Sequence, residues 1–378
     1  MMKFALRGAT IFDGYTTHQN SALLIDGEHI HSIVSEDSIP SDFSITELTG
    51  GTLAPGLIDL QVNGGGGVLL NNAPTQDTLE TMARGHAKFG VTRILPTVIS
   101  DTPEVSIAAI RSAKKCDVKH SGVLGIHIEG PFFSIEKAGV HRIEKLRSLA
   151  ASDWTWLKEL AELPSIITLA PEQTSLEDIE AIAELGIRIC AGHTNAHYQD
   201  VKNAFDHGLS GFTHLYNAMS QMQGREPGVV GAALSLKDTW AGLIADGIHA
   251  HPASMLAAIN AKGFEKIFLV SDSMANIGSD KKTFELYGEL IEERDGRLVN
   301  ANGNLAGSAI SLLDAVRYSI NELNLAPEQA LAMASRVPAT YMKLDNTFGS
   351  FKSGYISDIC WLDEHWNIAG TWRAGQKL

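Results

Sequence analysis

Cysteine is scarce in this chain. The 378 residues include three cysteines, Cys116, Cys190 and Cys360, which are widely spaced and form no Cys-x-x-Cys pair. This spacing argues against a disulfide scaffold and fits a reducing compartment. We therefore expect a cytoplasmic protein.

Long apolar runs are missing too. No segment approaches the roughly 20 apolar residues of a membrane helix, and the opening MMKFALRGATIFDG lacks the apolar core and cleavage site of a signal peptide.

Positively charged residues are fewer than negatively charged ones, with 30 Lys and Arg against 44 Asp and Glu, which gives a net charge of −14. We expect no binding to nucleic acid or membrane, and an anionic substrate would need a local basic pocket.

The chain does contain a regular alternation of short apolar strands and amphipathic helices from residue 57 onward. The eight predicted strands are LIDLQV (57–62), VTRILPTV (91–98), GVLGIHIE (122–129), SIITLAP (165–171), IRICAGH (187–193), SGFTHLY (210–216), WAGLIAD (240–246) and KIFLVSD (266–272). After the eighth strand, residues 310–342 have the pattern of two helices. Eight strand–helix units predict an α/β fold of the (β/α)8 TIM-barrel type, with an open doubly wound sheet as the alternative.

Short β-like segments flank this region at both ends of the chain. We predict that residues 1–53 and 345–378 pair into one discontinuous β-sandwich domain, and that residues 54–344 form the barrel.

Polar side chains gather at the carboxyl ends of six predicted strands. Such ends converge at one mouth of a parallel barrel, where active sites lie, so we expect these residues to share a site. They are Gln61 and Asn63, Glu129, His193, His214, His249 beside Asp246, and Asp272.

Two histidines and one carboxylate in this set, His193, His214 and Glu129, have the composition of a catalytic zinc site with one open position. Asp272 is then placed to take a proton from water and return it to a leaving group. This combination predicts metal-dependent hydrolysis. By contrast, we interpret His86, His127 and His207 as structural, His86 because it lies on the apolar side of its helix.

Seven motifs carry a resemblance to a known family: APGLIDLQVNGGGG, HIEGPF, AGHTNA, THLYNAM, GREPG, ADGIHA and VSDSM, in this order between residues 54 and 274. They resemble the N-acetylglucosamine-6-phosphate deacetylases of the amidohydrolase superfamily. NGNLAGSA near residue 302 and the tail GSFKSGYISDICWL are also similar, so the likeness covers nearly the whole chain.

The resemblance implies hydrolysis of N-acetyl-D-glucosamine 6-phosphate to D-glucosamine 6-phosphate and acetate, in amino-sugar catabolism. It implies Glu129, His193 and His214 as metal ligands and Asp272 as general base and then acid. His141 would contact the sugar or the acyl oxygen. Asn217, Ala218, Arg225 and His249 would bind the phosphate end, with Arg225 reaching a neighbouring subunit's site in a homodimer or higher homo-oligomer.

The stretch LQVNGGGG departs from many amidohydrolases, which have His-x-His where this chain has Gln61 and Asn63. Amides are weaker zinc ligands than imidazoles. We predict one divalent ion per subunit, with Zn²⁺ as the first choice and Fe²⁺, Mn²⁺ or Co²⁺ as alternatives. Gln61 would lie beside the reacting water, and the four glycines would leave room for the sugar.

Three other functions fit part of this pattern. Another amidohydrolase activity, such as a cyclic amidase or a D-aminoacylase, would leave the Arg225 and His249 pair without a purpose. A non-heme Fe(II) oxygenase also uses two histidines and a carboxylate, but would give Asp272 no role. A non-catalytic relative would have no reason to keep all four residues.

Overall fold

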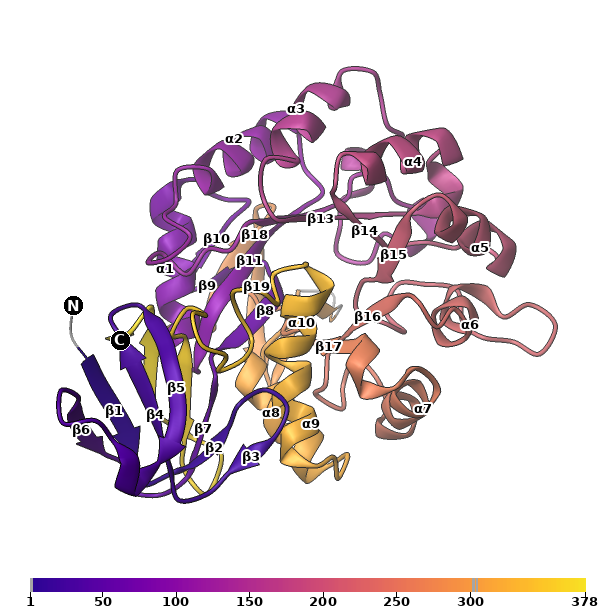
Figure 1. Cartoon of the computed structure of the whole chain (residues 1–378). Helices are drawn as coiled ribbons and strands as arrows, with labels where there is room; N and C mark the ends of the chain where they lie inside the picture. The colour runs from indigo at the N-terminus through magenta and orange to yellow at the C-terminus, as the bar shows by residue number, and fades with distance from the viewer. Residues whose placement is uncertain (1–2, 301–302, 304) are drawn as a thin grey trace.

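The computed structural model describes residues 3–300, 303 and 305–378. At its centre lies a parallel sheet whose strands are adjacent in chain order (Figure 1). These strands are β8 (Leu57–Val62), β11 (Val91–Ile99), β12 (Ile126–Glu129), β13 (Ser165–Leu169), β14 (Arg188–Ala191), β15 (Leu209–Phe212), β16 (Trp240–Leu243) and β17 (Ile267–Leu269). Every predicted strand is present.

The sheet closes into a barrel just beyond its first and last strands. Val62 and Ser273 form a parallel bridge, the Asp272 amide donates to the Gln61 carbonyl at 3.0 Å, and the Asn63 amide donates to the Ser273 carbonyl at 2.9 Å. The prediction of a TIM barrel is confirmed, and the open-sheet alternative is excluded.

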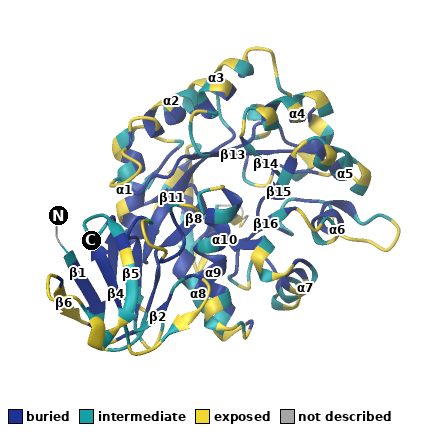
Figure 2. Ribbon diagram, viewed as in Figure 1, coloured by how far each residue is buried: buried dark blue, intermediate teal, exposed yellow. Residues whose placement is uncertain are grey.

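Helices cover the outside of the barrel and bury their apolar sides against the strands (Figure 2). Side-chain caps start several of them, for example Ser175, whose hydroxyl accepts from the Asp178 amide. The helices are α1 (Gln76–Ala87), α2 (Pro103–Ala113), α3 (Asp153–Leu160), α4 (Leu176–Glu184), α5 (Tyr198–Asp206), α6 (Gly228–Ser235), α7 (Pro252–Lys262), α8 (Leu312–Asn321), α9 (Pro327–Met333) and α10 (Arg336–Tyr341). Short 3-10 turns are η1 (Glu36–Ser38), η2 (Ile135–Lys137), η3 (Ile143–Lys145), η4 (Pro171–Gln173) and η5 (Phe264–Lys266).

The region after the eighth strand forms three helices, α8 to α10, where the sequence predicts two. A break at Ala334 and Ser335 divides the second predicted helix into α9 and α10. None of the helices in the described residues has both the length and the apolar sequence needed to cross a membrane.

Both ends of the chain contribute to β-sheets beside the barrel, where indigo and yellow strands lie together (Figure 1). One sheet has the order β5–β4–β1–β6 and the other β24–β23–β22–β7–β2–β3. The strands are β1 (Lys3–Arg7), β2 (Thr10–Phe12), β3 (Thr17–His18), β4 (Ser21–Asp26), β5 (His29–Ser35), β6 (Ser44–Glu47), β7 (Thr52–Pro55), β22 (Ile359–Leu362), β23 (Ile368–Arg373) and β24 (Gln376–Lys377). The terminal β-region is as predicted, while its exact boundaries at residues 53 and 345 stay a prediction.

A further antiparallel sheet follows the eighth barrel strand and was not predicted. It consists of β18 (Thr283–Leu286), β19 (Glu289–Arg294), β20 (Arg297–Val299) and β21 (Leu305–Ser308). A small hairpin, β9 (Gly64–Gly65) and β10 (Val68–Leu69), follows the first barrel strand. Of the NGNLAGSA motif, Asn302 and Asn304 lie outside the described residues.

Candidate active site

A cavity of about 180 Å³ opens at the carboxyl ends of the barrel strands, where the sequence predicts the site. Its lining comes from most of the loops that follow these strands. Among the lining residues are Asn63, Glu129, His141, His193, His214, Asn217, Ala218, His249 and Asp272.

Three side chains in the cavity converge on one point. His193 Nε2 lies 3.0 Å from His214 Nε2, and the two nitrogens lie 3.3 and 3.1 Å from Oε1 of Glu129. All three residues are buried, and their ligand atoms lie within 4.8 Å of one another. The structure thus brings the three predicted metal ligands together.

The donor set fits a divalent metal ion. Nδ1 of His193 is 2.9 Å from the Lys137 carbonyl, and because a carbonyl only accepts, this nitrogen carries the proton. The Nε2 lone pair of His193 is therefore directed at the cluster, as in most metal-ligating histidines. Two imidazole nitrogens and a carboxylate oxygen leave one coordination position for water or substrate.

Charges at the cluster favour an ionised carboxylate. Burial alone would raise the pKa of Glu129, but the hydrogen bonds and charges of His193 and His214 hold that pKa well below its ordinary value. Burial likewise opposes the charged form of His214, yet contact with Glu129 raises the pKa of this imidazole. An anionic Glu129 is the form that binds a cation.

The backbone is strained at the residues that carry the chemistry. His193, His214 and Asp272 have φ values of 48°, 31° and 52°, in the left-handed region that non-glycine residues seldom adopt. Glu172 stabilises the turn after His193, since its carboxylate accepts from the Thr194 hydroxyl at 2.5 Å and the Asn195 amide at 2.6 Å. Such strain is maintained where the surrounding structure holds functional groups in place.

Asp272 faces the cavity beside the cluster and is held there by two side-chain amides, Gln61 at the end of β8 and Asn63 just after it. Asn63 Nδ2 donates to Oδ1 of Asp272 at 2.7 Å, and Gln61 Nε2 donates to the same oxygen at 3.2 Å and to Glu129 Oε1 at 3.1 Å. Burial, followed by the negative charge of Glu129, raises the pKa of Asp272 to about 6. Gln61 thus lies between two carboxylates and does not itself line the cavity.

His141 is buried at the cavity wall between Phe133 and His193, with ring centroids 5.0 and 4.4 Å away. Burial lowers the pKa of His141 well below its ordinary value. The imidazole is therefore neutral at physiological pH. A neutral imidazole can donate one hydrogen bond to a substrate without adding a charge.

His249 lies at another part of the same cavity. Its Nδ1 is 2.6 Å from Oδ2 of Asp246, and the Asp246 Oδ1 accepts from the His249 amide at 2.9 Å. Asn217 and Ala218 line the cavity as well, so three of the four residues expected at the phosphate end come together. Arg225 does not: it is exposed on the segment before α6 and is absent from the lining of this cavity.

The four glycines after Asn63 do not line the cavity, contrary to our expectation that they leave room for the sugar. They lie against α1 and the segment after Asp272: a Cβ on Gly65 would come within 2.7 Å of His86 Nε2, and one on Gly64 within 2.8 Å of the Ala275 amide. His86 is fully buried, and its Nε2 is 2.9 Å from the Gly64 carbonyl. The glycines permit close packing of the loop that carries Asn63.

The other two histidines interpreted as structural make hydrogen bonds away from the cluster. His127 bonds to Thr97 and Thr168 inside the barrel, and burial lowers its pKa to about 4. His207 Nδ1 bonds to the Asn203 carbonyl at 2.8 Å.

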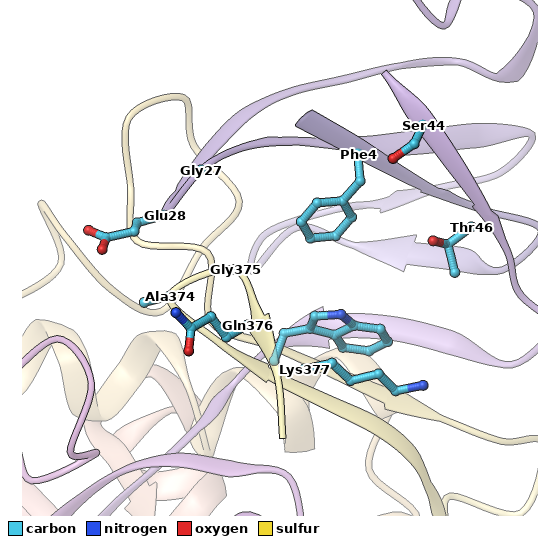
Figure 3. A pocket seen from close by; sticks show the side chains of 10 residues that line it. Phe4, Gly27, Glu28, Ser44, Thr46, Ala374, Gly375, Gln376 and Lys377 are labelled. Carbon is cyan, nitrogen blue, oxygen red and sulfur yellow. The ribbon is translucent and has the colours of Figure 1, made fainter. Parts of the chain in front are cut away.

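A larger hollow, of about 530 Å³, lies in the terminal β-region (Figure 3). Its ten lining residues include Phe4, Trp372 and two charged side chains, Glu28 and Lys377. Glu28 is paired with neighbouring cations, and no lining residue is a histidine or a cysteine. This hollow has no set of groups for catalysis, in contrast to the smaller cavity.

Comparison with known proteins agrees with this geometry. The amidohydrolase family matches residues 52–377. The chain belongs to the amidohydrolase family. It is therefore a hydrolase of a metal-dependent family, and the resemblance read from its motifs is confirmed.

Individual relatives within the amidohydrolase family are sugar-phosphate deacetylases. The chain is 42% identical to the N-acetylgalactosamine-6-phosphate deacetylase of Shewanella sp. (strain ANA-3), over 88% of this chain and 84% of the relative. It is 33% identical to the N-acetylglucosamine-6-phosphate deacetylase of Haemophilus influenzae, over 98% of both chains. The crystal structure of N-acetylglucosamine-6-phosphate deacetylase from Pasteurella multocida superposes with a TM-score of 0.96 at 34% identity, with full coverage of both chains.

Proposed function

We propose that this amidohydrolase removes the N-acetyl group of N-acetyl-D-glucosamine 6-phosphate, giving D-glucosamine 6-phosphate and acetate. The observation that supports it most is the meeting, in one cavity, of the Glu129–His193–His214 cluster, the carboxylate of Asp272 and the His249–Asp246 pair. The first two suit amide hydrolysis, and the third suits an anionic end of the substrate.

The residues have separate roles in this reaction. A single divalent ion held by Glu129, His193 and His214, with Zn²⁺ proposed, would polarise the acetamide carbonyl and lower the pKa of a water molecule. Asp272 takes the proton of the attacking water and gives it to the amine nitrogen as the C–N bond breaks. Asp272 suits both transfers because it lies beside the cluster and the two amides occupy only its Oδ1 atom.

His141 and the phosphate-end residues orient the substrate. His141 donates to the carbonyl oxygen, on which negative charge develops as water attacks. His249, Asn217 and Ala218 bind the phosphate end. Because Arg225 is exposed and outside its own chain's cavity, we propose a homodimer in which Arg225 of the partner subunit completes the phosphate site.

A second substrate is supported by relatives that are N-acetylgalactosamine-6-phosphate deacetylases. The relative with 42% identity is an N-acetylgalactosamine-6-phosphate deacetylase, so N-acetyl-D-galactosamine 6-phosphate is a candidate alongside the gluco epimer. A cytoplasmic location also belongs to this proposal, supported by three buried free cysteines.

Acetate release from three sugars tests the proposed function. We expect rapid turnover of the 6-phosphates and, for unphosphorylated N-acetylglucosamine, a kcat/KM at least about 100-fold lower, since losing a charge-assisted contact costs several kcal/mol. The rates on the gluco and galacto epimers identify the preferred substrate. Equal turnover of phosphorylated and free sugar would refute the roles given to Arg225 and His249.

A further inference from the structure

The β18–β19 hairpin, which was not predicted from the sequence, is attached to the barrel close to His141. The Tyr287 hydroxyl, at the turn of this hairpin, donates to the Ser100 carbonyl at 2.5 Å. Burial raises the pKa of Tyr287, so the hydroxyl keeps its proton and remains a donor. The Arg142 guanidinium packs on the Tyr287 ring, 5.3 Å from its centroid, and donates to the Tyr287 carbonyl. The hairpin turn is thus fixed against Ser100, which contacts the His141 ring, and against Arg142, which follows His141 in the chain.

Ser100 in turn makes two contacts with His141. Its backbone amide donates to Nδ1 at 3.2 Å, and its hydroxyl lies 2.8 Å from the same nitrogen. A backbone amide can only donate, so Nδ1 of His141 must be the nitrogen without a proton. The single proton of the neutral ring is therefore on Nε2.

The surroundings of Ser100 are built to hold it in this position. The Ile99 amide donates to Asn71 Oδ1 at 3.0 Å, and Asn71 Nδ2 donates to the Ile99 carbonyl at 2.9 Å, which fixes the backbone before Ser100. A Cβ on Gly130 would come within 2.1 Å of the Ser100 hydroxyl. Glycine, with φ of 97°, is thus needed beside Glu129 for the hydroxyl to reach His141.

Nε2 of His141 has no hydrogen-bond partner among the described residues, although the ring is buried and lines the cavity. The Nε2–H group is therefore free to donate to an acceptor on a molecule bound in the cavity. We propose that Tyr287 and Ser100 are positioning residues which hold His141 in the Nε2–H tautomer, so that it donates to the acyl oxygen of the substrate. This inference rests on the proposed deacetylation, and it assigns the hairpin a part in it.

The tautomer can be tested without turnover. In zinc-loaded protein with ¹⁵N-labelled histidines, His141 is assigned from the signal lost in a His141→Asn variant. We expect an Nε2–H imidazole with Nδ1 at the shift of an acceptor nitrogen. An Nδ1–H form or an imidazolium would overturn the proposal.

Kinetics of Tyr287→Phe test the positioning. We expect kcat on N-acetylglucosamine 6-phosphate to fall about 10-fold, since small misplacements of a catalytic group are costly, while KM and bound zinc stay the same. The matched control is Tyr355→Phe, which removes another tyrosine hydroxyl that donates to a backbone carbonyl at 2.5 Å, that of Asp345, and it should leave kcat unchanged. If Tyr287→Phe fails to fold, Ser100→Ala replaces it, with a smaller loss expected because the backbone amide remains.

A substrate with an N-trifluoroacetyl group separates donation to the acyl oxygen from a general structural effect. The electron-poor carbonyl of this substrate depends less on a hydrogen bond for activation. On it, the kcat of Tyr287→Phe should therefore be close to that of wild type. An equal loss on both acyl groups, or a kcat within twofold of wild type on the acetyl substrate, would refute the proposal. If wild type releases no acetate but shows the Nε2–H tautomer, the proposed function fails and the positioning of His141 stands.

Discussion

Asn63 donates a 2.7 Å hydrogen bond to Oδ1 of Asp272 across the seam where the first and eighth strands close the barrel. Gln61 donates to the same oxygen at 3.2 Å. Oδ2 of Asp272 has no hydrogen-bond partner among the described residues. The two amides therefore occupy one carboxylate oxygen and leave the other for proton transfer.

Removing this restraint should slow proton transfer while the metal site remains intact. We expect Asn63→Ala to lower kcat by about 10-fold through lost orientation of Asp272, with the bound metal unchanged by elemental analysis. Asn203→Ala, on the surface of α5, is the control and should behave as wild type. Loss of metal in Asn63→Ala would mean that the amide acts on the ligands instead of on Asp272.

Subunit mixing tests the place of Arg225. Arg225→Ala and Asp272→Asn should each be nearly inactive alone. In Asp272→Asn we expect kcat to fall by about 10²–10⁴-fold, because the general base is lost. If Arg225 serves the neighbouring site, a mixed dimer holds one complete site, made of Asp272 from one chain and Arg225 from the other. Activity should then reappear on mixing, and a mixture as inactive as its components would contradict the arrangement.

A buried ion pair connects the barrel to the terminal β-region. Arg93 Nε is 2.5 Å from Oδ2 of Asp358, and neither side chain is more than 5% exposed. We expect Asp358→Asn to destabilise the protein by about 3–5 kcal/mol, because it leaves a buried guanidinium unpaired. Glu159→Gln breaks the more exposed pair with Arg111 and should cost less than about 1 kcal/mol. Denaturant unfolding measures both, and similar losses would contradict this account.

Asp59 predicts a pH dependence of stability. Burial raises the pKa of Asp59 to about 7, and its Oδ2 has no hydrogen-bond partner in the part of the chain that the structure describes. The folded state therefore keeps a proton that the unfolded state loses above about pH 4. This proton on Asp59 stabilises the folded state fully below about pH 4. As the pH rises to about 7 the stabilisation is lost, and the free energy of unfolding falls by up to about 4 kcal/mol. Asp59→Asn should remove this decline in unfolding experiments at pH 5 and 8, and the same decline in the variant would contradict it.

The sequence predicted the barrel because each strand is a short apolar run that ends in polar or glycine residues, as in LIDLQVNGG and IRICAGH. It also predicted the cavity, because the carboxyl ends of parallel strands must converge. The β18–β21 sheet was missed because its longest strand, ELIEER, is highly charged and the other three strands have only three or four residues each. Asp295–Gly296 between β19 and β20 is a hairpin signal that could have revealed it.

Residues that hold the catalytic groups were harder to find than the groups themselves. Ser100, Glu172 and Tyr287 act through contacts between loops, and such contacts depend on distances that no local pattern contains. Asp246, which holds His249, could be found from the sequence. It lies three residues before His249 and belongs to the pattern of polar residues at strand ends.

A zinc titration of metal-stripped protein, with acetate release from N-acetylglucosamine 6-phosphate as the readout, decides whether one metal ion per chain is enough. Gln61 and Asn63 bond to carboxylates where a second metal would need imidazoles. We therefore predict no release without metal and a linear rise that ends at one equivalent of zinc per chain. Full activity in the stripped protein, or a rise that continues to two equivalents, would contradict it.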